Sequence, residues 1–119
     1  MEKQFSLESA MSDHDVLVIT LREDHLDAGN VLEFKDAIQA AIQGKTRVVL
    51  DMSGVKVVDS SGLGALISCL RLLNSQHGDF KLCAMSKTIR ALFELMRMHR
   101  LFSIYASRDD AVGSFAEVS

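Results

Sequence analysis

Residues 47–73 read RVVLDMSGVKVVDSSGLGALISCLRLL, and this stretch decides the fold. Arg47–Met52 is a continuous apolar, β-branched run, which is typical of a strand buried on both faces. A loop follows, and Asp59–Gly62 then opens a helix whose apolar side carries Leu63, Leu66, Ile67, Leu70 and Leu73. A buried strand, a loop and an amphipathic helix in this order predict one unit of an α/β protein.

Strands and helices continue to alternate on both sides of this unit. The other predicted strands are Phe5–Met11, Val16–Leu21, Asp79–Ala84 and Leu101–Tyr105. The other predicted helices are one that Asp27 caps and Gly44 ends, one that Ser86 caps, and one over Arg108–Val118. Because the connections are short, we expect an α/β fold with right-handed crossovers. Its sheet should be mostly parallel, with four to five strands, an antiparallel edge strand and about four helices.

Length and composition fit one domain over residues 1–119, with 48% hydrophobic and 24% charged residues. A net charge of −3 argues against nucleic-acid binding. The N-terminus does not resemble a signal peptide, and the longest apolar stretch, Leu63–Leu70, is too short to span a membrane. We therefore expect a cytoplasmic monomer that binds neither nucleic acid nor membrane. Cys69 and Cys83 form no CxxC pair, so we expect buried thiols and no metal site.

Polar residues gather in three loops at the predicted carboxyl ends of strands, where the functional groups of α/β sheets lie. These loops are Arg22–Asp27, Asp51–Ser61 and Met85–Lys87, and the middle one is the richest. Ser60 and Ser61 there allow two interpretations. One is helix capping, which a serine provides for about 1 kcal/mol. The other is a hydroxyl at the positive end of a helix, where a phosphate meets free N–H groups and Gly62 and Gly64 permit close approach.

Motifs of known enzyme classes do not fit the sequence. Gly62-Leu63-Gly64 is followed by Ile67 where a dinucleotide fingerprint needs Gly or Ala, and neither GxxxxGK[ST] nor GxSxG occurs. None of the four histidines has a spacing that pairs it with a serine, and His25 is expected to be a solvated surface residue. We therefore predict a binding protein without catalytic residues or cofactor.

The stretch Asp51–Leu66, DMSGVKVVDSSGLGAL, closely resembles D-L-S-x-V-x-[FY]-[ILM]-D-S-[ST]-G-L-G-x-L. That is the signature of the STAS-domain anti-sigma factor antagonists, the bacterial switch proteins of partner-switching modules. Three further segments are similar to the family's acidic loop, its R-L-F helix and its last strand, namely His25–Asn30, Arg90–Leu95 and Leu101–Tyr105. Two segments depart from the family: Arg22–His25 replaces G-E-[IL]-D, and Val57–Val58 replaces an aromatic residue and Met.

The resemblance implies a STAS fold and a phosphorylation switch. Ser60 corresponds to the serine that is phosphorylated in this family, and Ser61 to its neighbour. The unphosphorylated protein is expected to bind a GHKL-type serine kinase that is the anti-sigma factor or its relative, and so to free the client. Phosphorylation is expected to dissociate the pair, and a PP2C-type phosphatase to reset it. The partner contacts that the resemblance implies are Asp24, Asp27, Asn30, Asp59, Ser61, Gly62, Leu63 and Gly64.

Two other function classes stay open. The length suits a receiver domain phosphorylated on aspartate with Mg²⁺, and Glu23, Asp24 and Asp51 lie at predicted strand ends, but Ser103–Ser107 lacks the lysine that a receiver needs. A small hydrolase or ligand-binding α/β domain is less favoured because no base is paired with a nucleophile. Within the family interpretation, the client is a sigma factor or a regulator of secretion, biofilm formation or second messengers.

Overall fold

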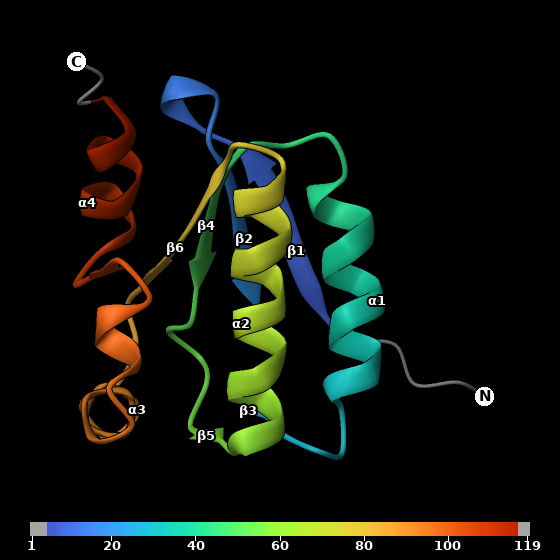
Figure 1. Ribbon diagram of the computed structural model, residues 1–119, viewed down its shortest axis with the longest axis vertical. Helices are drawn as coiled ribbons and strands as arrows, with labels where there is room; N and C mark the ends of the chain where they lie inside the picture. Colours follow the sequence, from blue (N-terminus) through green and yellow to red (C-terminus); the bar gives the residue numbers. More distant parts are fainter. Residues whose placement is uncertain (1–4, 117–119) are drawn as a thin grey trace.

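The main sheet has five strands in the order β1-β2-β4-β6-β7, in a computed structural model that describes residues 5–116 (Figure 1). The strands are β1 Leu7–Met11, β2 Leu17–Leu21, β4 Arg47–Asp51, β6 Asp79–Cys83 and β7 Ile104–Tyr105. β1 pairs antiparallel with β2, and every other neighbouring pair is parallel. The expected mostly parallel sheet with an antiparallel edge strand is confirmed.

Four α-helices cover this sheet, as expected. They are α1 Val31–Ile42, α2 Ser60–Ser75, α3 Lys87–Leu95 and α4 Arg108–Gly113. Phe34 of α1, Leu66 of α2 and Phe93 of α3 belong to one buried cluster, whereas Ala111 and Val112 of α4 belong to another. Three helices therefore pack on one face of the sheet, and α4 packs on the other.

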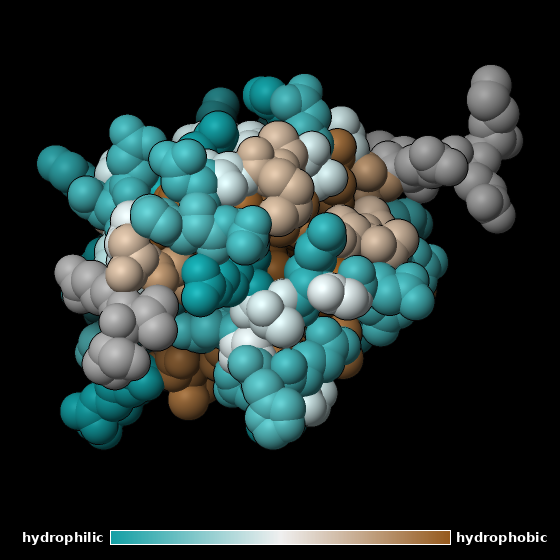
Figure 2. All heavy atoms as spheres, turned by 90° about the horizontal axis from the view of Figure 1, so that it is seen from above, coloured by the Kyte–Doolittle hydropathy of each residue, from teal (hydrophilic) through white to brown (hydrophobic). Residues whose placement is uncertain are grey.

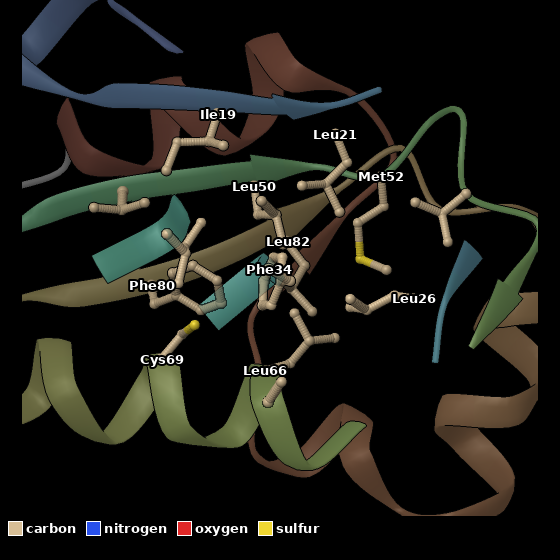
Figure 3. Packing of buried hydrophobic residues seen from close by; sticks show 14 of the residues in the cluster. Ile19, Leu21, Leu26, Phe34, Leu50, Met52, Leu66, Cys69, Phe80 and Leu82 are labelled. Atoms are coloured by element: carbon tan, nitrogen blue, oxygen red, sulfur yellow. The ribbon is translucent and has the colours of Figure 1, made fainter. Parts of the chain in front are cut away.

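β2 shows why its sequence is continuously apolar. Leu17, Ile19 and Leu21 belong to the cluster under α1, α2 and α3, while Val18, and Val16 just before the strand, belong to the cluster under α4. Figure 3 shows Ile19, Leu50 and Leu82 of neighbouring strands in one layer with Leu66 and Cys69 of α2. Successive side chains of a strand point to opposite faces, so a strand that is covered on both sides needs apolar residues throughout.

Several boundaries differ from the prediction. Two short strands, β3 His25–Leu26 and β5 Val57–Val58, form a second sheet within segments that were expected to be loops. The last strand is only Ile104–Tyr105, because the N–H groups of Leu101 and Phe102 donate to the carbonyl of Met98 and belong to the preceding turn. The final helix continues as a 3-10 turn to Ala116, and Val118 lies outside the described residues.

The surface is polar at one end of the molecule. Seen from the end opposite the first turn of α2, hydrophilic residues cover most of the surface (Figure 2). None of the helices in residues 5–116 has the length and apolar character needed to cross a membrane.

Both cysteines are buried and free, as the sequence predicts. Burial raises the pKa of the Cys69 thiol and of the Cys83 thiol to about 12. Because the thiolate is the reactive form, the native protein should resist an aromatic disulfide reagent at pH 8, and both thiols should react at once in guanidinium chloride. Rapid labelling of either cysteine in the native protein would show that the core opens easily.

Candidate functional site

The segments that follow β2 and β4 run side by side and are joined by backbone hydrogen bonds. The carbonyl oxygen of Asp24 accepts the N–H groups of Lys56 and Val57, at 2.7 and 3.2 Å. β3 then pairs in parallel with β5, so that His25 lies opposite Val57. This pairing brings the Asp24–Asn30 segment to the start of α2 (Figure 1). Sequence reasoning missed it because a two-residue strand has no periodicity to detect.

The carboxylate of Asp59 joins the two segments. Its Oδ1 accepts the backbone N–H of Gly62 at 3.0 Å and so caps α2. Its Oδ2 accepts the backbone N–H of Ala28 at 3.1 Å. The hydrogen bond from Gly62 is the main reason why the pKa of Asp59 lies below its usual value, and the bond from Ala28 adds to it. Asp59 is therefore a helix cap and a brace between the loops.

Ser60 and Ser61 are the first two residues of α2, and both are exposed. Their interpretation as helix caps is wrong, because Asp59 occupies the capping position and its side chain accepts the N–H of the first turn. The two hydroxyls therefore lie on the surface at the N-terminus of a 16-residue helix, where the helix dipole favours negative charge.

The two glycines in the first turns of α2 have different surroundings. A Cβ on Gly62 would collide with the carbonyl oxygen of Leu26 and lie 3.1 Å from Cγ1 of Val58. A Cβ on Gly64 would have no neighbour within 4 Å. Gly62 therefore allows α2 to approach β3 closely, whereas Gly64 leaves open surface. Leu63, between them, is buried in the core.

The loop between β3 and α1 is shaped by its own side chains. The Oδ1 of Asn30 accepts the N–H of Asp27 at 3.0 Å, and its Nδ2 donates to the carbonyl of His25 at 2.8 Å. Asn30 is only 6% exposed, so it holds the loop from within. Asp27 does not cap α1 as predicted, because its Oδ1 accepts the N–H of Gly29 at 2.9 Å and the capping position is that of Asn30.

His25 is half-buried between two carboxylates, although the sequence suggested a solvated side chain. Its Nδ1 lies 2.9 Å from Oδ1 of Asp24, and its Nε2 lies 4.0 Å from Oδ1 of Asp27. The hydrogen bond with Asp24 is the main cause that raises the pKa of His25 above its usual value. The imidazole is therefore hydrogen-bonded to Asp24 and lies near Asp27, the two acidic residues that were expected to contact a partner.

Asp51, at the end of β4, has a structural role. Nη2 and Nε of Arg108 donate to its Oδ2 at 2.8 and 3.2 Å, and the N–H of Ser53 donates to its Oδ1 at 2.9 Å. Burial by itself raises the pKa of Asp51, but the bonds from Arg108 and Ser53 outweigh burial and hold the pKa below its usual value. This pair fastens α4 to the sheet.

In the third loop, Ser86 caps α3 as predicted, and its side chain accepts the N–H of Ile89 at 3.1 Å.

The acidic residues of the receiver interpretation do not converge. Asp51 is paired with Arg108, Asp24 with His25, and Oε2 of Glu23 accepts the N–H of Ser6 at 2.9 Å. Within residues 5–116, no group of three His, Cys, Asp or Glu side chains is placed to hold a metal ion. The three acidic side chains are therefore each engaged in a separate contact and do not form the shared acidic site that a receiver domain needs.

Comparison with known proteins identifies the family of this chain. Residues 9–111 match the STAS domain family. The chain belongs to this family. An anti-sigma F factor antagonist of Paenibacillus polymyxa is 23% identical to this STAS domain over 116 residues, which cover 96% of this chain and 99% of the relative. The family resemblance that the sequence carries is confirmed.

Solved structures of related proteins share the fold of this STAS domain. An anti-sigma-factor antagonist (STAS) domain protein from Planctomyces limnophilus superposes with a TM-score of 0.84 at 22% identity, covering 93% of this chain and 98% of that one. The Bacillus cell fate determinant SpoIIAA in its phosphorylated form has a TM-score of 0.67 at 25% identity, covering 92% and 98%. The predicted STAS fold is confirmed.

Alanine substitution should distinguish Gly62, which packs closely against β3, from Gly64, which faces open space. Gly62→Ala should lower the free energy of unfolding by about 1–3 kcal/mol, because the new methyl group meets the backbone of β3. Gly64→Ala should leave it unchanged or raise it by up to about 1 kcal/mol, because alanine is the better helix former. Urea denaturation measures both. Equal effects of the two substitutions would contradict the assigned roles.

The pair of Asp51 and Arg108 should make stability depend on pH. Arg108→Ala should cost about 1–3 kcal/mol at neutral pH, because it leaves a buried carboxylate without its main partner. The folded pKa of Asp51 is lowered, so the contribution is present above the unfolded pKa and is lost as the pH falls through the folded one. The stabilities of wild type and variant should therefore converge only as the pH falls below 3.8, the ordinary pKa of an aspartate, as measured by denaturation at several pH values.

A matched control for this prediction is Arg22→Ala. Arg22 pairs with Glu8 at 2.8 Å, but both side chains are exposed, at 53% and 67%. Its removal should change stability far less, because water screens such pairs. If Arg22→Ala and Arg108→Ala were equally destabilising, the assignment of Asp51 as the buried tether of α4 would be wrong.

Proposed function

We propose that this STAS domain is an anti-sigma factor antagonist whose binding to a GHKL-type serine kinase is ended by phosphorylation of Ser60. The observation that carries the proposal is the exposed hydroxyl of Ser60 on the first residue of a helix whose cap is Asp59. The N–H groups of Gly62 and Ala28 donate to the carboxylate of Asp59 and not to Ser60, so we expect a phosphate on Ser60 to leave these bonds in place. The name of the Paenibacillus relative supports the role, and the solved phosphorylated form of SpoIIAA supports the modification.

The unphosphorylated surface suits close contact with a protein partner. Ser60, Ser61 and Gly64 are exposed and small, and Gly64 has open space beside it. Asp24 is exposed, and Asp27 and Asp59 are half-buried at the same end of the molecule. These residues form the proposed contact surface. Gly62, Leu63 and Asn30 are buried, so their part is to hold this surface in shape.

Phosphorylation changes this surface more than it changes the fold. A phosphate adds a charge of about −1.5 to −2. At a helix N-terminus negative charge is favourable by roughly 0.3–1 kcal/mol, so α2 tolerates it. Burying the same charge against a partner that lacks a matching basic pocket costs several kcal/mol, and each 1.4 kcal/mol is a tenfold loss of affinity. The phosphate therefore releases the partner while the domain stays folded.

The protein is the acceptor in phosphoryl transfer, and the kinase is the catalyst. We place the switch in the cytoplasm, as a monomer, where the kinase has ATP and a PP2C-type phosphatase resets the phosphoserine. The partner's client is a sigma factor or another regulator that the kinase sequesters. Incubation with ATP and Mg²⁺ alone should leave the protein unmodified.

Substitution of the two serines tests the switch. The GHKL-type serine kinases encoded in the same genome are purified and tested with ATP and Mg²⁺. The cognate kinase should add one phosphate to wild type and to Ser61→Ala, and none to Ser60→Ala. Ser60→Ala should stay bound to the kinase in the presence of ATP, whereas Ser60→Asp should bind at least tenfold more weakly in calorimetry, because its charge resembles that of the phosphate.

Ser61→Ala is the control for the position of the phosphate. If Ser61→Ala blocks phosphate incorporation and Ser60→Ala does not, the acceptor is Ser61. If neither substitution at position 60 changes binding to a kinase that does bind wild type, the switch is refuted. Stoichiometric autophosphorylation would refute the acceptor role.

A further inference from the structure

Apolar side chains are exposed at the end of α3 and in the 3-10 turn that follows it. Leu95 is 80% exposed, Leu101 53% and Met96 47%. Six large hydrophobic side chains are exposed among the described residues, and three of them lie within residues 95–101. α3 already has a separate buried side, formed by Ile89 and Phe93. The exposed apolar residues are therefore not part of the contact between α3 and the sheet.

The same segment is basic in a protein that is acidic overall. Residues 87–101 contain Lys87, Arg90, Arg97, Arg100 and a single acid, Glu94, which gives a net charge of +3, while the whole chain has −3. Glu94 is paired with Arg90, at 3.8 Å between Oε2 and Nε. No carboxylate of residues 5–116 forms an ion pair with Arg97 or Arg100. Their guanidinium groups thus carry charge without a partner in the described part of the chain.

Arg97 has a backbone conformation that is unusual for a residue other than glycine. It ends α3 in the left-handed conformation, with φ 59° and ψ 23°, and its N–H donates to the carbonyl of Glu94 at 3.1 Å. Glycine is the usual residue at such a position, and a residue with a Cβ costs roughly 1 kcal/mol more there. This conformation leads the chain from the end of α3 into the 3-10 turn that carries Arg100.

We propose that Leu95, Met96, Arg97, Arg100 and Leu101, the α3 surface, bind an acidic amphipathic segment of a partner protein. Guanidinium groups bind carboxylates through paired hydrogen bonds, and Leu and Met side chains adapt to an apolar helix face. An acidic segment is repelled by a chain of net charge −3, so it is directed to this basic segment. An anionic membrane fits less well, because the surface has two arginines and anionic lipids are bound by clusters of about four to eight basic residues.

Binding at the α3 surface is separate from the Ser60 switch. The surface lies at the end of α3 and in the turn that follows it, and it includes no residue of the contact surface around Ser60. Ser60→Asp should therefore leave it unaffected, so the two proposals can fail independently.

The experiment is a titration of the ¹⁵N-labelled full chain with a synthetic amphipathic peptide of repeating Glu-Leu-Leu-Glu units. A peptide of Lys-Leu-Leu-Lys units is the charge control. The acidic peptide should shift the amide signals of residues 92–101 saturably, and added salt should weaken the binding of the peptide. Arg100→Glu should lower its affinity at least tenfold, and Leu95→Ser should also lower it.

The matched control is Arg71→Glu, the same charge change at an exposed residue of α2. It should leave the affinity within twofold of wild type, as should Ser60→Asp. The proposal is overturned if the Lys peptide binds equally well, if the shifts lie outside the α3 surface, or if Arg71→Glu weakens binding as much as Arg100→Glu. Sedimentation with phosphatidylglycerol vesicles, without any binding of the acidic peptide, would overturn it in favour of a membrane.

Discussion

The carboxylate of Asp59 accepts the backbone N–H groups of Gly62 and of Ala28, which lies 31 residues before Asp59 in the chain, and the geometry of the site depends on it. Through Gly62 it fixes the first turn of α2, and through Ala28 it fixes the loop before α1. Because the side chain of Asp59 caps α2, the side chains of Ser60 and Ser61 are not needed as helix caps. The close approach of α2 to β3, which only glycine at position 62 permits, completes the same arrangement.

The residues that hold the site in shape differ from the residues that a partner can reach, so a modification of the second group can change binding without changing the fold. The residues that hold the site are buried or bonded to the backbone, as Asn30 is to Asp27 and His25. The residues that a partner can reach are small and exposed, as Ser60 and Gly64 are. A charge added at Ser60 therefore acts on the surface and meets the favourable end of the helix dipole. The ion pair of Arg108 and Asp51 fastens α4 to the other face of the sheet and does not involve the residues around Ser60.

Much of this structure follows from the sequence alone. Continuous apolar runs such as Val16–Leu21 predict strands covered on both faces, and Ser86 predicts the start of α3, because both signals are local. The short strands β3 and β5 could not be predicted, since two residues carry no pattern and their pairing joins distant segments. The partner of Asp51 lies 57 residues away, so its ion pair has no sequence signal. For the same reason, composition alone cannot tell the bonded Asn30 from an exposed contact residue.

The central claim is that phosphate at Ser60 alters the surface while the arrangement held by Asp59 persists. The most direct measurement is hydrogen exchange and chemical shifts by NMR, on protein with phosphoserine incorporated at position 60 during translation. We predict that the amides of Ala28 and Gly62 stay as protected as in the unmodified protein. Shift changes should be confined to residues 24–30, 59–66 and 85–87. Loss of protection at Ala28 and Gly62, or loss of signal dispersion across the sheet, would contradict the account.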